Sequence, residues 1–166
     1  MDYKEFFKLS SILLMYPQED IYYSLKDYEP VDIYDERFID FLNFYKNTPL
    51  QELQEEYVRS FDFNKDGTLY LTYHRFKDDV QRGSFLAKLI DYYRKKGFEF
   101  AANELPDFFP VILEFISEID LDTGIKVLQN FEKEIETILK SLDSLGSPYG
   151  DLIDSILEMT KNREVK

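Results

Sequence analysis

The residues whose spacing most resembles a chemical site are Asp62, Asn64, Asp66 and Gly67. Oxygen ligands at alternate positions, followed by a glycine, are typical of the calcium loop of an EF-hand. That loop also needs a bidentate glutamate at its twelfth position, where this chain has Tyr73. The residues that end at Tyr73 alternate in the manner of an extended segment rather than a helix. The sequence therefore favours a turn, in which Gly67 adopts a positive φ and an Asn or Asp side chain bonds the backbone.

Other groups that could carry out catalysis are scarce. His74 is the only histidine and cysteine is absent, which excludes thiol nucleophiles and zinc sites built from several soft ligands. The six glycines are scattered, so no glycine-rich loop for phosphate is present. We expect His74 to be a loop residue that bonds the backbone, and we expect the protein not to be an enzyme.

One set of carboxylates differs from the solvated acidic faces elsewhere in the chain. If a helix starts at Pro106, then Asp107, Glu114 and Glu118 lie on one face of it. Pro110 would then follow the first turn, where a proline removes a backbone hydrogen bond and kinks the helix. We expect this kink to expose a carbonyl group and to shape a groove beside the acidic line.

Composition limits the class of protein. The chain has 166 residues, 44% of them apolar, which fits one domain (1–166) with a frayed tail (161–166). The formal net charge of −13 disfavours nucleic acid and anionic lipid and favours basic partners, although solubility alone is a sufficient reason for it. The N-terminus opens on charged residues, and the longest apolar run, Ile12 to Met15, is too short to span a bilayer. We expect a cytoplasmic protein without stable membrane association.

Apolar residues recur at helical spacing along most of the chain, which predicts an all-α bundle of about seven helices. The expected helices cover 2–15, 35–46, 49–61, 79–96, 106–119, 122–144 and the segment that follows Ser147-Pro148. Thr48 is expected to cap the third of them and Ser147-Pro148 to cap the last, while Gly97 and Gly146 are expected to end two others. Residues 62–77 are expected to cross between helices in an extended form.

Three segments together carry a family signature. They are Tyr57-Val58-x-x-Phe61-Asp62, then Leu69-Tyr70-Leu71-Thr72-Tyr73 followed by Arg82-Gly83, then Glu104-Leu105-Pro106-Asp107-Phe108-x-Pro110-x-x-Leu113-Glu114-Phe115. The chain resembles the NarJ-type nitrate reductase assembly chaperones, or delta subunits, within the TorD-like family of molybdoenzyme maturation chaperones. The third segment is the most specific, and the detailed resemblance covers residues 57–117.

The resemblance implies an all-helical, TorD-like protein that is cytoplasmic and not catalytic. It implies that the chain binds the N-terminal segment of the catalytic subunit of a molybdoenzyme, with respiratory nitrate reductase as the nearest match. The chain would hold that client while the molybdenum cofactor is inserted before assembly. Because the cofactor belongs to the client, none is expected to stay bound to the chain, which is expected to be a monomer or a weak homodimer.

A basic amphipathic segment suits an acidic groove lined with aromatic side chains. We expect this groove between the helix that ends at Asp62 and the helix that starts at Pro106, closed by residues 69–73. The expected peptide contacts are Tyr57, Asp62, Tyr70, Tyr73, Asp107, Glu114 and Glu118. The expected structural residues are Phe61, Arg82, Gly83, Pro106, Pro110, Leu113 and Phe115. Among these, Arg82 is expected to pair with Asp62 or Asp107, and Gly83 to allow close helix packing.

The sequence leaves three alternatives to this function. The chain could be a generic acidic helical adaptor for some other basic amphipathic helix, or a chaperone for a related molybdenum reductase. It could also be an enzyme that uses the acidic face with a divalent metal. Binding of an N-terminal peptide from a cognate reductase would distinguish a reductase chaperone from a metal-dependent enzyme.

Overall fold

The computed structural model describes residues 2–32, 35–101 and 103–161, and these residues are largely helical. Within them lie ten α-helices: α1 (Tyr3–Leu13), α2 (Glu19–Lys26), α3 (Glu36–Asn47), α4 (Leu50–Tyr57), α5 (Leu71–Phe76), α6 (Gln81–Lys95), α7 (Phe109–Glu118), α8 (Leu121–Asn130), α9 (Glu132–Leu145) and α10 (Tyr149–Lys161). A π-helical turn, Val58–Asp62, continues α4, and a 3₁₀ turn, Lys65–Gly67, follows. The all-α class is confirmed, whereas the expected number of about seven helices is wrong.

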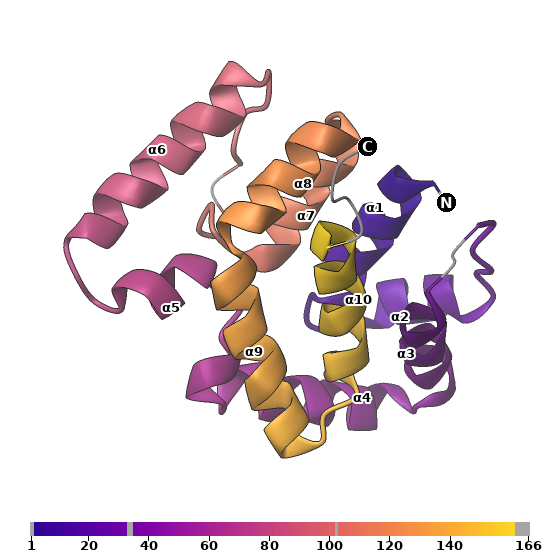
Figure 1. Cartoon of the computed structure of the whole chain (residues 1–166). Helices are drawn as coiled ribbons and strands as arrows, with labels where there is room; N and C mark the ends of the chain where they lie inside the picture. Colours follow the sequence, from indigo (N-terminus) through magenta and orange to yellow (C-terminus); the bar gives the residue numbers. More distant parts are fainter. Residues whose placement is uncertain (1, 33–34, 102, 162–166) are drawn as a thin grey trace.

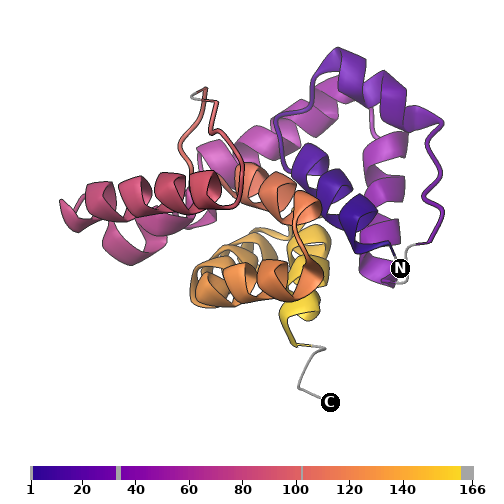
Figure 2. The same ribbon diagram turned by 90° about the horizontal axis from the view of Figure 1, so that it is seen from above.

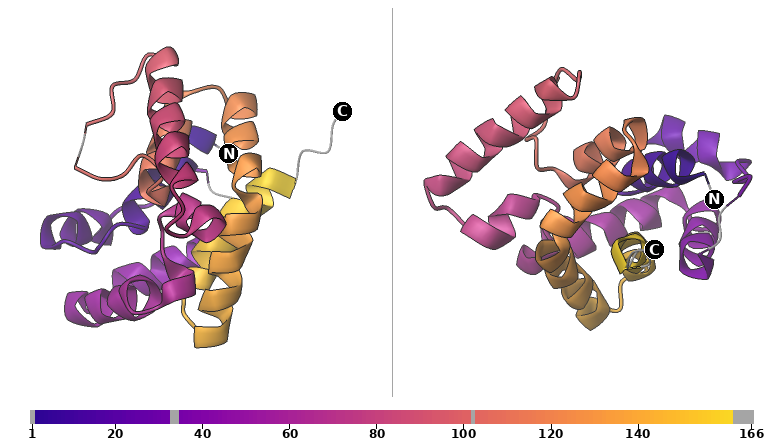
Figure 3. Two further views of the ribbon diagram at one scale, coloured as in Figure 1. Left: turned by 90° about the vertical axis from the view of Figure 1, so that its left-hand side faces the viewer. Right: turned by 45° about the horizontal axis from the view of Figure 1, so that its top comes forward.

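The helices pack around one contiguous cluster of buried apolar side chains. Helix α1 packs chiefly on α7, and α10 packs on α3, α8 and α9. Figure 1 shows α6 standing away from this body at one side, with α5 below it. From above, the α5–α6 pair lies beside two groups, one formed by α1 to α4 and the other by α8 to α10 (Figure 2). In the left view of Figure 3, α6 lies on the outer side of α7 and α8.

Extended backbone between α4 and α6 is shorter than expected. Tyr70 forms an isolated antiparallel bridge with Phe108, and the Phe109 amide donates to the Leu69 carbonyl at 2.8 Å. The expectation of an extended crossing is wrong after this bridge, because α5 starts at Leu71. The bridge ties the start of α5 to the segment that leads into α7.

The turn that resembles a calcium loop is stabilised by hydrogen bonds from the Asn64 side chain. The Asn64 amide donates to the Ser60 carbonyl at 3.1 Å and to the Ser141 hydroxyl at 2.7 Å. Gly67 does not have a positive φ, so that expectation is wrong. A Cβ atom at Gly67 would lie 2.3 Å from the Ser60 carbonyl oxygen, so glycine is needed there for space.

Several helix ends agree with the sequence. Gly97 (φ 89°) and Gly146 (φ 64°) adopt the left-handed backbone that ends a helix. The Tyr149 amide donates to the Ser147 hydroxyl at 3.2 Å, which confirms the predicted cap of α10.

The expected helix over 122–144 is instead two helices, because the chain leaves helical geometry at Phe131 (φ −110°, ψ 11°).

Thr48 is not the cap of α4. It is the C-cap of α3, where its hydroxyl donates to the Phe44 carbonyl at 2.6 Å. Pro49 takes the capping position, and α4 begins with the next residue. A threonine next to a proline can close one helix as readily as it opens another, so the local sequence alone did not decide between the two.

The predicted kink at Pro110 is also wrong. Helix α7 starts at Phe109 rather than Pro106, so Pro110 lies in the first turn, where no intrahelical bond is lost. Its carbonyl accepts a hydrogen bond from the buried Ser11 hydroxyl at 2.7 Å. Gly83 is exposed, and a Cβ there would meet nothing within 4 Å, so close packing is not the reason for that glycine.

Within the described part of the chain, no helix is both long enough and apolar enough to cross a membrane. The predicted frayed tail, 161–166, lies outside the described residues except for Lys161, which ends α10.

Candidate functional site

Three of the predicted contact residues, Tyr57, Asp62 and Tyr70, line one groove of about 360 Å³. We call it the acidic groove. Its walls come from the segment after α1, from α4 with its π-helical turn, and from the bridge between Tyr70 and Phe108. It is also lined by Met15, Tyr16, Phe61, Leu69, Glu104 and Phe108.

Aromatic rings form both walls of the acidic groove. On one wall the Tyr57 ring lies 4.9 Å from the Phe61 ring and meets the Tyr16 ring edge-on at 5.6 Å. On the other wall the rings of Tyr70 and Phe108 lie 5.0 Å apart. Tyr16 is 44% exposed, whereas Tyr57 is 6% exposed. This wall of the groove therefore combines a buried ring, that of Tyr57, with an accessible ring, that of Tyr16.

The charged groups of the acidic groove are both carboxylates, those of Asp62 and Glu104, and both residues are exposed. Neither forms an ion pair with any residue that the structure describes. The Tyr70 hydroxyl donates to Glu104 Oε1 at 2.6 Å. Burial raises the pKa of the Tyr57 phenol, and the negative charges of Asp62 and Glu104 raise it further. The groove thus has a negative potential that favours a cationic side chain held among rings.

Asp107 lies behind the acidic groove rather than in it. The residue is fully buried, and Oδ2 accepts hydrogen bonds from the Thr72 amide at 2.9 Å and the Thr72 hydroxyl at 2.6 Å. A guanidinium nitrogen of Arg82 lies 3.6 Å from the same oxygen, which confirms one of the two predicted partners of Arg82. The predicted acidic line through Asp107 is wrong, because this residue precedes α7 and is not at the surface.

Glu114 and Glu118 line a different hollow, of about 330 Å³, on the outer side of α7. The Glu114 carboxylate is already paired with the Lys8 ammonium at 2.5 Å. Tyr73 lines neither hollow, and two cations lie over its ring at 5.2 Å and 5.7 Å. Of the seven predicted contacts, three therefore line the acidic groove, two line the hollow beside α7, Asp107 lies in the interior, and Tyr73 is half-buried outside both hollows.

The remaining predicted structural residues pack inside the protein. Phe61 and Phe115 are each 5% exposed, and Leu113 is fully buried. Pro106 is buried, and its carbonyl accepts a hydrogen bond from the Tyr93 hydroxyl at 2.6 Å. This contact connects α6 to the segment that precedes α7.

The sequence reasoning missed Tyr16, Glu104 and the role of Phe108 as a groove wall. Tyr16 follows the end of α1, where no periodic pattern marks it. Glu104 stands at the start of the most specific family segment, and its charge beside Leu105-Pro106 was the available signal. Its contact with Tyr70, 34 residues earlier, becomes visible only in three dimensions.

Comparison with known proteins identifies a family for the chain. Residues 27–152 match the family model described as nitrate reductase delta subunit. The chain belongs to this family. The matched range includes Tyr57, Asp62, Tyr70 and Glu104 but not Tyr16.

Curated relatives bear related names. One is the "Probable nitrate reductase molybdenum cofactor assembly chaperone NarJ" of Bacillus subtilis (strain 168), which is 28% identical over 166 aligned residues, covering 96% of this chain and 90% of the relative. Another is the "Probable nitrate reductase molybdenum cofactor assembly chaperone NarW" of Escherichia coli (strain K12), 27% identical over 92% of this chain and 66% of the relative. The "Nitrate reductase-like protein NarX" of Mycobacterium tuberculosis (strain ATCC 25618 / H37Rv) is 31% identical over 60% of this chain but only 15% of its own length.

Proposed function

We propose that this chain is an assembly chaperone for a nitrate reductase. In this proposal it binds the N-terminal segment of the catalytic subunit in the acidic groove and holds that client for insertion of the molybdenum cofactor. Family membership and the names of the relatives support the class of function. The observation that carries the choice of site is the convergence of Tyr57, Tyr70, Asp62 and Glu104 in one groove whose described lining has no cation.

The groove suits a basic amphipathic segment for two physical reasons. Aromatic rings supply a large apolar area with few rotatable bonds, so apolar side chains of the client lose water at little cost in ordering the walls. The carboxylates of Asp62 and Glu104 lack cationic partners in the described residues, so a Lys or Arg of the client does not have to displace another charge. The Tyr70 hydroxyl, by donating to Glu104, helps to orient that carboxylate.

The proposal has further parts. We place the protein in the cytoplasm as a monomer or weak homodimer with a TorD-like helical fold. We expect it to hold no cofactor permanently, since the molybdenum cofactor belongs to the client. The net charge of −13 supports a protein partner of opposite charge rather than nucleic acid.

The test is a titration of the chain with a fluorescent peptide from the N-terminus of its cognate catalytic subunit, followed by anisotropy. The double variant Asp62→Asn with Glu104→Gln keeps the side-chain shapes and removes both charges. We expect it to weaken binding by about tenfold or more, as for the loss of charged hydrogen bonds. Asp27→Asn with Glu52→Gln is the matched control, because it removes the same two charges from exposed positions outside both hollows.

Each result is informative. If Glu114→Gln with Glu118→Gln loses binding and the Asp62/Glu104 variant keeps it, then the hollow beside α7 is the site and the acidic groove is not. Equal binding of a peptide with the same composition in scrambled order would instead favour a generic adaptor for basic segments. If no N-terminal peptide binds at all, then the proposed chaperone mechanism fails.

A further inference from the structure

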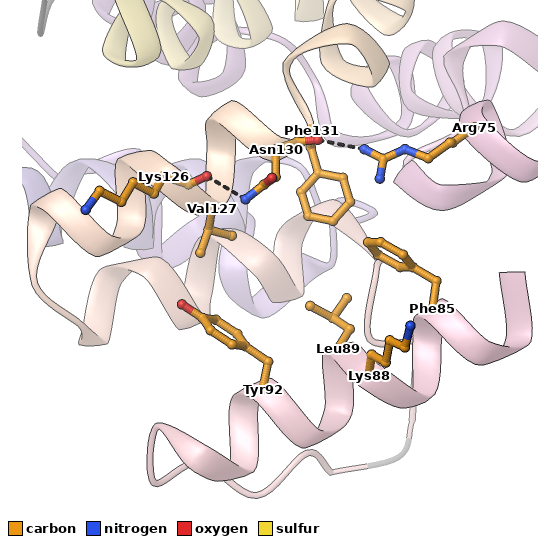
Figure 4. Close-up of a pocket in the computed structure, with 9 residues that line it drawn as sticks. All are labelled: Arg75, Phe85, Lys88, Leu89, Tyr92, Lys126, Val127, Asn130 and Phe131. Carbon is orange, nitrogen blue, oxygen red and sulfur yellow. Dashed lines mark hydrogen bonds between the residues drawn. The ribbon is translucent and has the colours of Figure 1, made fainter. Parts of the chain in front are cut away.

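A second groove of about 320 Å³ separates α6 from α8, and it has the opposite charge. We call it the basic groove. It is lined on the α6 side by Phe85, Lys88 and Tyr92 and on the α8 side by Lys126, Val127 and Phe131. Figure 4 shows Val127 and Phe131 pointing toward Tyr92, Leu89 and Phe85 across the space between the two helices, whereas the Lys126 side chain extends to one side.

The floor of the basic groove is apolar and mostly buried, and the rings that flank it are only half-buried. Leu89, Val127 and Phe131 form it, with exposed fractions of 8%, 7% and 3%. Helix α6 buries only two of its 15 residues, Leu89 and Tyr93, while Phe85 and Tyr92 remain half-buried. The spacing of Phe85, Leu89 and Tyr92 places them along one face over about 10 Å, or two helical turns. A face of this length matches one short helix laid along it.

Every charged side chain that lines the basic groove is a cation, in a chain whose net charge is −13. Lys88 and Lys126 are exposed and form no ion pair with the described residues. Arg75 is different, because it donates to the Glu134 carboxylate and to the Asn130 carbonyl. The Arg75 guanidinium also lies over the rings of Phe85 and Phe131, 5.3 Å and 5.6 Å from their centres. Arg75 thus closes one end, and the two lysines stand on opposite rims.

We propose that the basic groove binds an acidic amphipathic helix of a partner protein. Apolar side chains of that helix would cover the half-buried rings of Phe85 and Tyr92 above the apolar floor, and carboxylates at its flanks would meet Lys88 and Lys126. A small anion fits the site less well, because the floor is apolar and the most buried of the cations, Arg75, already has its acceptors. The charge of this groove is opposite to that of the acidic groove, so two segments of different charge can bind the chain at separate places.

The experiment uses the full chain and two designed 18-residue helices with leucines at i, i+4 and i+7. One helix has glutamates flanking the leucines, and the other has lysines there. Anisotropy titrations should show saturable binding of the glutamate helix, weaker at high salt, and at least about tenfold weaker binding of the lysine helix. The variant Lys88→Glu with Lys126→Glu should reverse this preference.

The matched control is Lys4→Glu with Lys140→Glu, which makes the same change in net charge at exposed lysines outside the groove. It should change the affinity for the glutamate helix by less than about threefold. The proposal is overturned if both helices bind equally or if the Lys88/Lys126 variant binds the glutamate helix like the parent. Competition by millimolar inorganic pyrophosphate without competition by a second glutamate helix would also overturn it, in favour of a small-anion site. The Asp62/Glu104 variant should still bind the glutamate helix. This binding tests the basic groove independently of the acidic groove, on which the proposed function depends.

Discussion

Asp107 offers the sharpest test of how the acidic groove is built. The residue is fully buried, and its Oδ2 accepts two hydrogen bonds from Thr72 while lying 3.6 Å from the Arg82 guanidinium. We predict that Asp107→Ala unfolds more readily than the parent. The substitution leaves a buried amide and a buried hydroxyl without their acceptor, and a largely buried cation without its counter-charge.

The magnitude follows from these contacts. A hydrogen bond to a charged group contributes about 1.5–3 kcal/mol, and removing one member of a buried ion pair costs about 3–5 kcal/mol. The Arg82 side chain is 20% exposed, so water compensates part of the lost charge. We therefore expect Asp107→Ala to lower the free energy of unfolding by about 3–4 kcal/mol. Asp107→Asn keeps an oxygen for Thr72 and should cost about 1–2 kcal/mol.

Urea unfolding followed by far-ultraviolet circular dichroism measures both values, provided that the dependence on urea concentration is unchanged. Glu118→Ala is the control, since an exposed carboxylate should change the unfolding free energy by less than about 0.5 kcal/mol. A double-mutant cycle with Arg82→Met should show coupling between the two residues. If Asp107→Ala is as stable as the parent within about 1 kcal/mol and yet loses the client peptide, then Asp107 is a ligand contact and our structural assignment is wrong.

Three further predictions concern stability, each measured by the urea midpoint. Gly67→Ala should lower the free energy of unfolding by about 1–3 kcal/mol through overpacking. Gly83→Ala, on an open helix face, should raise it by about 0.5–1 kcal/mol. Similar effects at both sites would contradict the packing argument. Burial, reinforced by the charge of a neighbouring tyrosine, raises the pKa of Tyr45 to about 12. The unfolded chain therefore loses this proton first, and the free energy of unfolding should fall as the pH rises from about 10 to 12. Tyr45→Phe should make this fall with pH less steep. Burial lowers the pKa of His74, whose Nε2–H donates to the Thr68 carbonyl at 2.7 Å. As the pH falls, the unfolded chain binds the proton first, so the free energy of unfolding should decrease below about pH 6.5. The same dependence of unfolding free energy on pH in His74→Gln would refute this.

The sequence predicted those helices whose signals are local. The starts and ends of α1, α3 and α10 follow from apolar spacing and from nearby capping residues. Helix α2 was missed because it has eight residues, of which only Tyr22 and Leu25 are buried, so no period repeats. Helix α5 was missed because its first turn depends on a distant residue. The Thr72 amide at its start is satisfied by the Asp107 carboxylate, 35 residues later.

The candidate site was predicted in part for the same reason. Tyr57, Asp62 and Tyr70 were expected to share a groove, and the structure brings them together. Asp107 was misplaced because residue spacing shows which positions share a face only where the helix exists, and α7 begins two residues after it. Glu104 was missed because nothing in its own neighbourhood indicates Tyr70, which lies beside it through the pairing of Tyr70 with Phe108.

The π-helical turn Val58–Asp62 has a consequence for how the family can vary. A π turn contains one residue more than the α turn it replaces. Deleting that residue would restore α-helical register and rotate the positions after it by about 100°. Asp62 would then turn away from Glu104, while Tyr57, before the turn, would keep its place on the wall. A single insertion or deletion here can therefore change which charge the groove accepts, without any substitution in the core.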